Sequence, residues 1–186
     1  MRVVIIGGVA GGMSAATRLR RLREDAEIVV FEMGEHVSYA NCGLPYFVSD
    51  VISNRDDLLL QTPTSLWNRF RIEVRVNSKV TKIDRVSKTV SVEDMVTGEI
   101  SESSYDYLVI STGAKPRRLE IPGIERALTL RNVTDADQIK ARFAETENAS
   151  AVILGAGFIG IELAENLSHL GIVTTIVQRG RTILSQ

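Results

Sequence analysis

Two glycine-rich turns carry the chemistry that is easiest to assign in this sequence. The more regular one follows an apolar run and precedes a helical stretch; it comprises Gly155, Ala156, Gly157, Phe158, Ile159 and Gly160. In this context the first glycine permits a tight turn, the second lets a pyrophosphate approach the backbone, and the third lets helix pack on strand. The N-terminus of the helix then offers N–H groups and a positive dipole end to phosphate. The pattern predicts a dinucleotide site.

A related turn near the N-terminus departs from this pattern at one position. It comprises Gly7, Gly8, Val9, Ala10, Gly11 and Gly12. Val9 takes the place of the middle glycine, which weakens the bare pattern. Glu32, however, ends the next predicted strand, where a carboxylate that binds the ribose hydroxyls is expected. We therefore predict a second nucleotide site at this turn.

The position that reads the ribose after the second turn holds no acid. The strand there ends in Val177 and is followed by Gln178 and Arg179, with Arg181 close by. An acid would favour NAD, because it accepts from the 2′-hydroxyl and repels a 2′-phosphate. Acceptance of NADPH is therefore plausible, although the two arginines are equally explained as exposed loop charges. The choice between NADH and NADPH stays open.

The only cysteine, Cys42, lies between Asn41 and a glycine. A single cysteine is more often a buried small hydrophobe than a reagent. Here turn and polar residues precede it, and residues 42–50 can open a short helix whose N-terminus favours the thiolate. A thiolate attacks a disulfide or is oxidised to a sulfenic acid. Without a second cysteine in the chain, the redox partner must be a sulfur from elsewhere, an oxygen atom or a flavin.

Short β-branched runs alternate with helical stretches, which is typical of parallel βαβ units. A strand, a glycine turn, a helix and a strand occur in this order near both ends of the chain. A capping box of Thr134 and Asp137 is expected to begin a helix between the two repeats. We predict strands at 3–6, 28–31, 72–76, 80–83, 89–92, 107–110, 151–154 and 173–177, and helices at 11–23, 63–70, 134–144 and from the second turn to residue 170.

Composition excludes several other classes of protein. The 186 residues carry a net charge of -1 with interspersed signs, which argues against a nucleic-acid or membrane surface. One cysteine forms no internal disulfide, and the apolar run at the N-terminus is too short for a signal peptide. We expect a soluble protein of the reducing cytoplasm. The one basic cluster, Arg18, Arg20, Arg21 and Arg23, is interpreted from composition alone as a solvated helix face.

Taken together, these segments resemble the flavoprotein pyridine nucleotide-disulfide oxidoreductases, most closely the single-cysteine branch of coenzyme A-disulfide reductases and persulfide reductases. The resemblance is carried by IIGGVAGGMSAATRLRRL, VSYANCGLPY, YDYLVISTGAKP, LRN and VILGAGFIGIELAENL, which span nearly the whole chain. It implies an α/β fold with two Rossmann-like nucleotide-binding domains of the three-layer FAD/NAD(P) type. The expected domains are an FAD-binding domain at 1–115 and an incomplete NAD(P)H-binding domain at 116–186.

The resemblance also implies roles for individual residues. Cys42 is the catalytic nucleophile and a cofactor-binding residue next to the flavin. The first glycine turn binds FAD with Glu32 on its ribose, and the second binds NADH or NADPH. Further cofactor-binding positions are Asn41, Val80, Thr112, Gly113, Glu162, Gln178 and Arg179. The coenzyme A substrate is expected at Ser14, Arg18, Arg21, Ser38 and Asn41, which gives the basic cluster a function. No metal site is expected.

Three alternatives remain at this point. NADH oxidases and peroxidases cycle their single cysteine through a sulfenic acid, but they usually carry a histidine where this chain has Ala10. A ferredoxin-type flavin reductase would make the cysteine incidental. Family members are also more than twice as long and form homodimers through a C-terminal domain, so the chain could be an inactive nucleotide-binding fragment.

Overall fold

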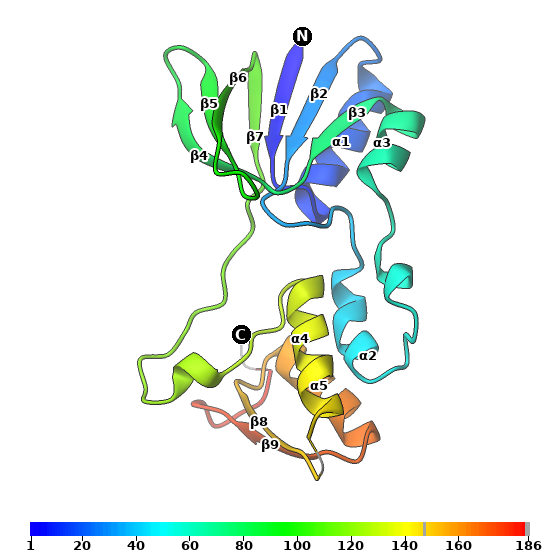
Figure 1. The fold of residues 1–186 in the computed structure, drawn as a ribbon, viewed down its shortest axis with the longest axis vertical. Coiled ribbons are helices and arrows are strands. Elements are labelled where there is room, and N and C mark those ends of the chain that lie inside the picture. Colours follow the sequence, from blue (N-terminus) through cyan, green and yellow to red (C-terminus); the bar gives the residue numbers. More distant parts are fainter. Residues whose placement is uncertain (147, 185–186) are drawn as a thin grey trace. The chain divides into compact units, whose positions relative to one another are not determined.

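The computed structural model describes residues 1–146 and 148–184 and confirms the predicted mixed α/β fold (Figure 1). Its contacts divide the chain into two compact units. Unit 1 comprises Met1–Tyr39 and Leu59–Ala114. Unit 2 comprises Ala40–Leu58 and Lys115–Gln186.

A parallel sheet forms the centre of unit 1, with its strands in the order β3-β2-β1-β7. One face packs against helix α1, and strand residues such as Val3, Ile5 and Ile28 share a buried cluster with Met13 and Ala16 of that helix. Strands buried on both faces need nearly continuous apolar sequence, as RVVII and EIVVF provide. The elements are β1 (Arg2–Ile6), α1 (Ala10–Leu22), β2 (Glu27–Phe31), α3 (Pro63–Phe70), β3 (Ile72–Arg75) and β7 (Tyr107–Ile110).

An antiparallel sheet covers the other face of the parallel one. It runs in the order β4-β5-β6, with bounds Ser78–Asp84, Thr89–Asp94 and Ile100–Ser104. Val90 and Val92 of β5 share a buried cluster with Val4, Ile6 and residues of β2. Helix, parallel sheet and antiparallel sheet thus give unit 1 the three layers that the resemblance implied.

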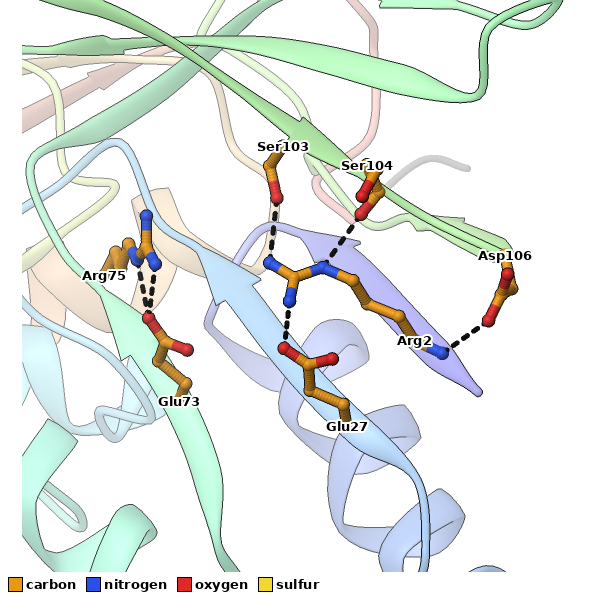
Figure 2. Close-up of polar contacts among 7 residues, drawn as sticks. All are labelled: Arg2, Glu27, Glu73, Arg75, Ser103, Ser104 and Asp106. Carbon is orange, nitrogen blue, oxygen red and sulfur yellow. Dashed lines mark hydrogen bonds and ion pairs between the residues drawn. The ribbon is translucent and has the colours of Figure 1, made fainter.

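Arg2 ties the amino edge of the parallel sheet to the antiparallel sheet (Figure 2). Its guanidinium pairs with Glu27 of β2 and donates to the Ser103 hydroxyl at 3.2 Å and the Ser104 carbonyl at 2.9 Å. Its backbone N–H donates to the Asp106 carboxylate at 2.7 Å. This cluster lies at the amino ends of the strands, so the opposite, carboxyl edge is left for the glycine turn and a ligand.

Unit 2 repeats the strand, turn, helix and strand of unit 1. Strands β8 (Ser150–Leu154) and β9 (Val173–Val177) pair in parallel, and α5 (Phe158–His169) connects them. The predicted internal repeat is therefore confirmed. Short 3-10 helices at Asn41–Gly43, Arg55–Leu58 and Ile124–Arg126 and helices α2 (Leu44–Val48) and α4 (Val133–Ala144) complete this unit.

The predicted cap of α4 is wrong by two residues. Asn132, rather than Thr134, is the N-cap, and its side chain accepts from the backbone N–H of Asp135 at 2.8 Å. Asparagine is as good an N-cap as threonine, so the pattern alone did not separate them. Asp137 instead forms a two-pronged ion pair with Arg55, with distances of 2.9 to 3.1 Å.

The segment that contains the cysteine packs with the helices of unit 2. Helix α2 contacts both α4 and α5, and ion pairs link Arg55 to Asp137 and Asp50 to Lys140. The buried Ser49 hydroxyl also lies 2.5 Å from the Asn166 amide oxygen of α5. The main division falls at Ala114, one residue from the expected boundary, but Ala40–Leu58 joins the later unit. The domain assignment of 1–115 and 116–186 stays a prediction.

Within the described ranges, no helix is long and apolar enough to cross a bilayer. Over the same residues, no three His, Cys, Asp or Glu side chains gather as metal ligands would.

Candidate functional site

The first glycine turn holds its shape through contacts that only glycine permits. Gly7 adopts φ +101° and its N–H donates to the Phe31 carbonyl at 2.8 Å. A Cβ on Gly12 would lie 1.8 Å from the Gly7 carbonyl oxygen. Helix α1 follows with Val9 as N-cap, no side-chain cap and no acid in its first turn. Its N-terminal N–H groups and dipole are therefore suited to phosphate, as the sequence predicted.

Glu32 is fixed at the carboxyl end of β2, beside this turn. Its two carboxylate oxygens accept from the backbone N–H groups of Gly8 at 2.7 Å and Gly34 at 2.8 Å. Ser38, in a left-handed conformation with φ 50°, donates its N–H to the Gly8 carbonyl at 2.9 Å. A carboxylate held by two donors has a defined orientation toward a ribose.

The STG segment meets the same turn, whereas Val80 does not take part in it. Ser111 follows β7, and its carbonyl oxygen would lie 2.2 Å from a Cβ on Gly7. Thr112 and Gly113 come next and are exposed. Val80 packs half-buried against the core between the two sheets, at an irregularity of β4. Its assigned cofactor contact stays a prediction.

The second turn repeats the first one closely. Gly155 has φ +109° and donates to the Val177 carbonyl at 2.9 Å, and a Cβ on Gly160 would lie 2.2 Å from the Gly155 carbonyl oxygen. Space is open around Gly157, and α5 begins next to it with no side-chain cap and no acid in its first turn. The geometry suits a pyrophosphate at this helix end as well.

Cys42 lies in the 3-10 turn Asn41–Gly43, just before α2, rather than within a regular helix. The thiol is free and exposed, and so is Asn41. A Cβ on Gly43 would meet side chains of Leu58 and Ile52 at 2.9 and 3.2 Å, which explains the glycine after the cysteine. The turn packs against Leu58 and Ile52 through Gly43, while the exposed thiol is accessible to a sulfur substrate.

Tyr46 and Glu162 form a pair near the thiol that the sequence did not reveal as a pair. Hydrogen bonding to the Glu162 carboxylate, and then the charge of that carboxylate, raise the pKa of the Tyr46 phenol. The Cys42 charge adds a smaller effect in the same direction, which places the phenol within electrostatic range of the thiol. The Oε2 of Glu162 is buried and has no hydrogen-bond partner among the residues that the structure describes. The only feature of the sequence that could have indicated Tyr46 as a site residue is its position one helical turn after Cys42.

The Glu162→Gln substitution should lower the pKa of Tyr46 toward its ordinary value of about 10, because the phenolate no longer forms beside an anion. Titration of phenolate absorbance, with Tyr46→Phe to assign the signal, measures the change. Glu165→Gln is the matched control, since Glu165 raises the pKa of Tyr46 less than Glu162 does. An unchanged Tyr46 titration in the Glu162→Gln variant would show that the pair does not form.

Three of the five residues expected to bind coenzyme A lie on one exposed face of α1. Ser14, Arg18 and Arg21 follow each other at spacings of four and three, and all three are exposed. Arg18 contacts no described residue through a hydrogen bond or ion pair. Arg20, by contrast, donates to the carbonyls of Phe70 and Arg71 at 2.8 and 2.9 Å, so it has a structural role. Within the basic cluster, Arg20 therefore stabilises the fold, whereas Arg18 has an exposed charge that could bind a ligand.

Comparison with known proteins identifies the relatives of this site. The family described as pyridine nucleotide-disulphide oxidoreductase matches residues 1–186. The chain belongs to this family.

Its named relatives within the family include disulfide and persulfide reductases. The coenzyme A disulfide reductase of Staphylococcus epidermidis is 36% identical over 98% of this chain. A reduced CoADR-RHD of Bacillus anthracis superposes with a TM-score of 0.95 at 46% identity, over 98% of this chain and 33% of the other. An NAD-dependent persulfide reductase from A. fulgidus gives 0.94 at 38%, over 99% and 35%. The chain spans 41% of the length of the staphylococcal relative.

The candidate site residues of this family member fall into two sets. Unit 1 holds the first glycine turn, Glu32, the STG segment, Ser38 and the exposed face of α1. Unit 2 holds Asn41, Cys42, the second glycine turn, Glu162, Gln178 and Arg179. Within each set, the turn donates a backbone N–H to the residue that is expected to read the ribose, Glu32 in unit 1 and Gln178 in unit 2. In unit 2, Tyr46 lies within electrostatic range of both Glu162 and Cys42.

Proposed function

We propose that this chain carries the redox-active thiol and the nucleotide-binding turns of a flavoprotein that reduces coenzyme A disulfide or a related persulfide with NAD(P)H. The observation that carries the proposal is the exposed Cys42, the only cysteine of the chain. Because these 186 residues contain no second cysteine, Cys42 forms no disulfide within them, and we assign the second sulfur to a substrate. The named relatives support coenzyme A disulfide or a persulfide as that substrate.

The chemistry of Cys42 follows from thiol–disulfide exchange. Its thiolate attacks one sulfur of coenzyme A disulfide, so that a bond forms between Cys42 and one coenzyme A while the substrate S–S bond breaks. The second coenzyme A leaves as a thiolate and takes up a proton. A two-electron reduction then breaks the new bond, which restores the Cys42 thiolate and releases the first coenzyme A. Tyr46 lies one helical turn after Cys42, and the Glu162 carboxylate, which accepts its hydrogen bond, raises the pKa of its phenol.

The turns of both units fit the nucleotides that supply these electrons. Each turn leads into a helix of more than two turns whose N-terminus has no side-chain cap. Each also contains a glycine with positive φ, which permits close approach of a phosphate. We assign the first turn with Glu32 to FAD and the second with Gln178 to the nicotinamide nucleotide. When bound, FAD supplies the transfer of two electrons from NAD(P)H to a sulfur–sulfur bond.

The second candidate is an NADH oxidase or peroxidase that uses a Cys42 sulfenic acid. An exposed thiol is compatible with that chemistry. The first turn, however, carries Ala10 in place of the histidine usual in that branch, and Ser14, Arg18 and Arg21 give α1 a polar face suited to a phosphorylated substrate.

A comparison of acceptors separates these functions. The full chain with FAD is supplied with NADPH or NADH, and coenzyme oxidation is measured with coenzyme A disulfide without oxygen, and with oxygen alone. We expect oxidation that depends on coenzyme A disulfide. Oxidation with oxygen alone, without a response to disulfide, would favour the oxidase. No oxidation with either acceptor would mean that the chain is a nucleotide-binding fragment.

Replacing Arg18 and Arg21 together by glutamine should raise the KM for coenzyme A disulfide and leave kcat nearly unchanged. Each lost charged hydrogen bond to phosphate is worth about 1.5 kcal/mol, or roughly a tenfold rise in KM. Steady-state kinetics measures the effect, with Arg85→Gln as the control because Arg85 is an exposed arginine in the turn between β4 and β5. Equal KM values for the double variant and the control would show that these arginines of α1 do not bind the substrate.

A further inference from the structure

The two glycine turns have corresponding residues at the position that reads the ribose. Glu32 directly follows β2, and Gln178 directly follows β9. Glu32 accepts from the backbone N–H of Gly8, the second residue of its turn, at 2.7 Å. Gln178 accepts from the N–H of Ala156, the second residue of its turn, at 3.2 Å. The same backbone donor is therefore satisfied by a carboxylate in unit 1 and by a neutral amide in unit 2.

This exchange removes the negative charge that opposes a 2′-phosphate. A glutamine oxygen still fixes the turn, so the structural part of the contact is retained. The electrostatic part, repulsion of a phosphate on the ribose, is lost.

The loop after Gln178 folds back on the second glycine turn. The Gln178 amide donates to the Thr182 carbonyl at 3.4 Å, and the Leu184 N–H donates to the Ala156 carbonyl at 2.9 Å. Ala156 is thus hydrogen-bonded through its N–H to Gln178, at the start of this loop, and through its carbonyl to Leu184, at the end. The residues between, Arg179 to Arg181, are held beside the glycine turn.

Both arginines of this loop are free to bind an anion. Arg179 and Arg181 are exposed, and neither forms a hydrogen bond or ion pair with any residue in the ranges that the structure describes. A guanidinium matches the geometry of a phosphate with two parallel N–H donors. With the neutral Gln178 in place of an acid, the two arginines give this loop a net positive charge.

We infer that Gln178, Arg179 and Arg181 make the second turn selective for NADPH over NADH, with both arginines pairing with the 2′-phosphate. The inference rests on the proposed assignment of this turn to the nicotinamide nucleotide. It names the coenzyme that the sequence left open, and it makes these three residues determinants of specificity rather than exposed loop charges.

Binding of two adenosine nucleotides to the full chain tests this inference without turnover. Calorimetry measures the affinity for adenosine 2′,5′-bisphosphate, which carries the 2′-phosphate, and for 5′-AMP, which lacks it. We expect the bisphosphate to bind at least tenfold tighter. The Arg179→Gln/Arg181→Gln variant should lose that preference and keep its affinity for 5′-AMP. Arg117→Gln, which removes another exposed arginine of unit 2, should change neither affinity.

A reciprocal variant tests the role of Gln178. Gln178→Glu retains an oxygen for the Ala156 N–H, as Glu32 provides for Gly8, and restores the acid. It should weaken binding of the bisphosphate at least tenfold and leave binding of 5′-AMP unchanged or tighter. Equal affinities of the unaltered chain for both nucleotides, no binding of either, or an equal loss of both in the arginine variant would overturn the inference.

The coenzyme inference and the proposed function fail separately. A chain that prefers the bisphosphate but does not reduce coenzyme A disulfide supports the inference and contradicts the function. A chain that reduces coenzyme A disulfide but binds both nucleotides equally contradicts the inference alone.

Discussion

Replacing Cys42 by serine should abolish the reduction of coenzyme A disulfide by NADPH. A serine hydroxyl does not form a disulfide, and the chain contains no other cysteine that could take over. Loss of a nucleophile of this kind lowers turnover by several orders of magnitude, so we expect a decrease of at least about 10³-fold. The rate of coenzyme oxidation with coenzyme A disulfide as the acceptor measures the effect.

The same variant should retain the bound flavin and the flavin reduction by NADPH. The substitution exchanges one atom of an exposed side chain and leaves the first glycine turn and Glu32, which we assign to FAD, unaltered. Flavin absorbance of the purified variant is therefore the control for folding. Turnover equal to that of the unaltered chain would refute Cys42 as the nucleophile.

The largest expected effect on stability comes from Gly12→Ala. The added methyl carbon would lie 1.8 Å from the Gly7 carbonyl oxygen and 3.2 Å from an Ile5 side-chain carbon. Because the first of these atoms belongs to the backbone, α1 must move away from β1 to make room. Overpacking of this kind costs about 3 kcal/mol of the free energy of unfolding, which urea denaturation measures. Flavin binding should weaken together with stability, since the turn and the helix N-terminus form one site.

Gly11→Ala provides the matched control one residue earlier in the same helix. Its added carbon would meet only the Ser111 side chain, at 3.4 Å and beyond. Alanine is favoured over glycine in helices by up to about 1 kcal/mol, so stability should stay the same or rise. If both variants lost stability equally, the close approach of Gly12 to Gly7 would not be the cause.

Local sequence predicted the two nucleotide units well because each turn encodes its own geometry. Gly7 and Gly155 both adopt positive φ, and Gly12 and Gly160 both sit where a Cβ would strike the first glycine of the turn. Buried parallel strands are also predictable, because their sequences are continuous apolar runs. These features depend on residues close together in the chain, and the structure confirms them.

Features that depend on distant residues were not predictable in the same way. Glu162 lies far along the chain from Tyr46, and only the packing of α2 with α5 brings them together. The ion pair between Arg55 and Asp137, which helps to join the cysteine segment to unit 2, has the same origin. Asp137 was instead interpreted as part of a cap, because a short local pattern was the only information available.

The basic helix α1 shows the limit of composition as an argument. Composition does not distinguish its arginines, but Arg20 donates to backbone carbonyls near α3 whereas Arg18 forms no hydrogen bond or ion pair with any residue that the structure describes. The position of each residue around the helix decides this difference. Ser14, Arg18 and Arg21 were grouped by the resemblance alone, and in the structure their spacings of four and three place them on one exposed face.

The central claim, that Cys42 exchanges with a coenzyme A sulfur, is tested most directly by the mass of the protein after reaction with coenzyme A disulfide. We predict an increase by one coenzyme A less two hydrogen atoms, removed by NADPH and mapped to the peptide that contains Cys42. An unmodified thiol, or a gain of oxygen atoms alone, would contradict the claim.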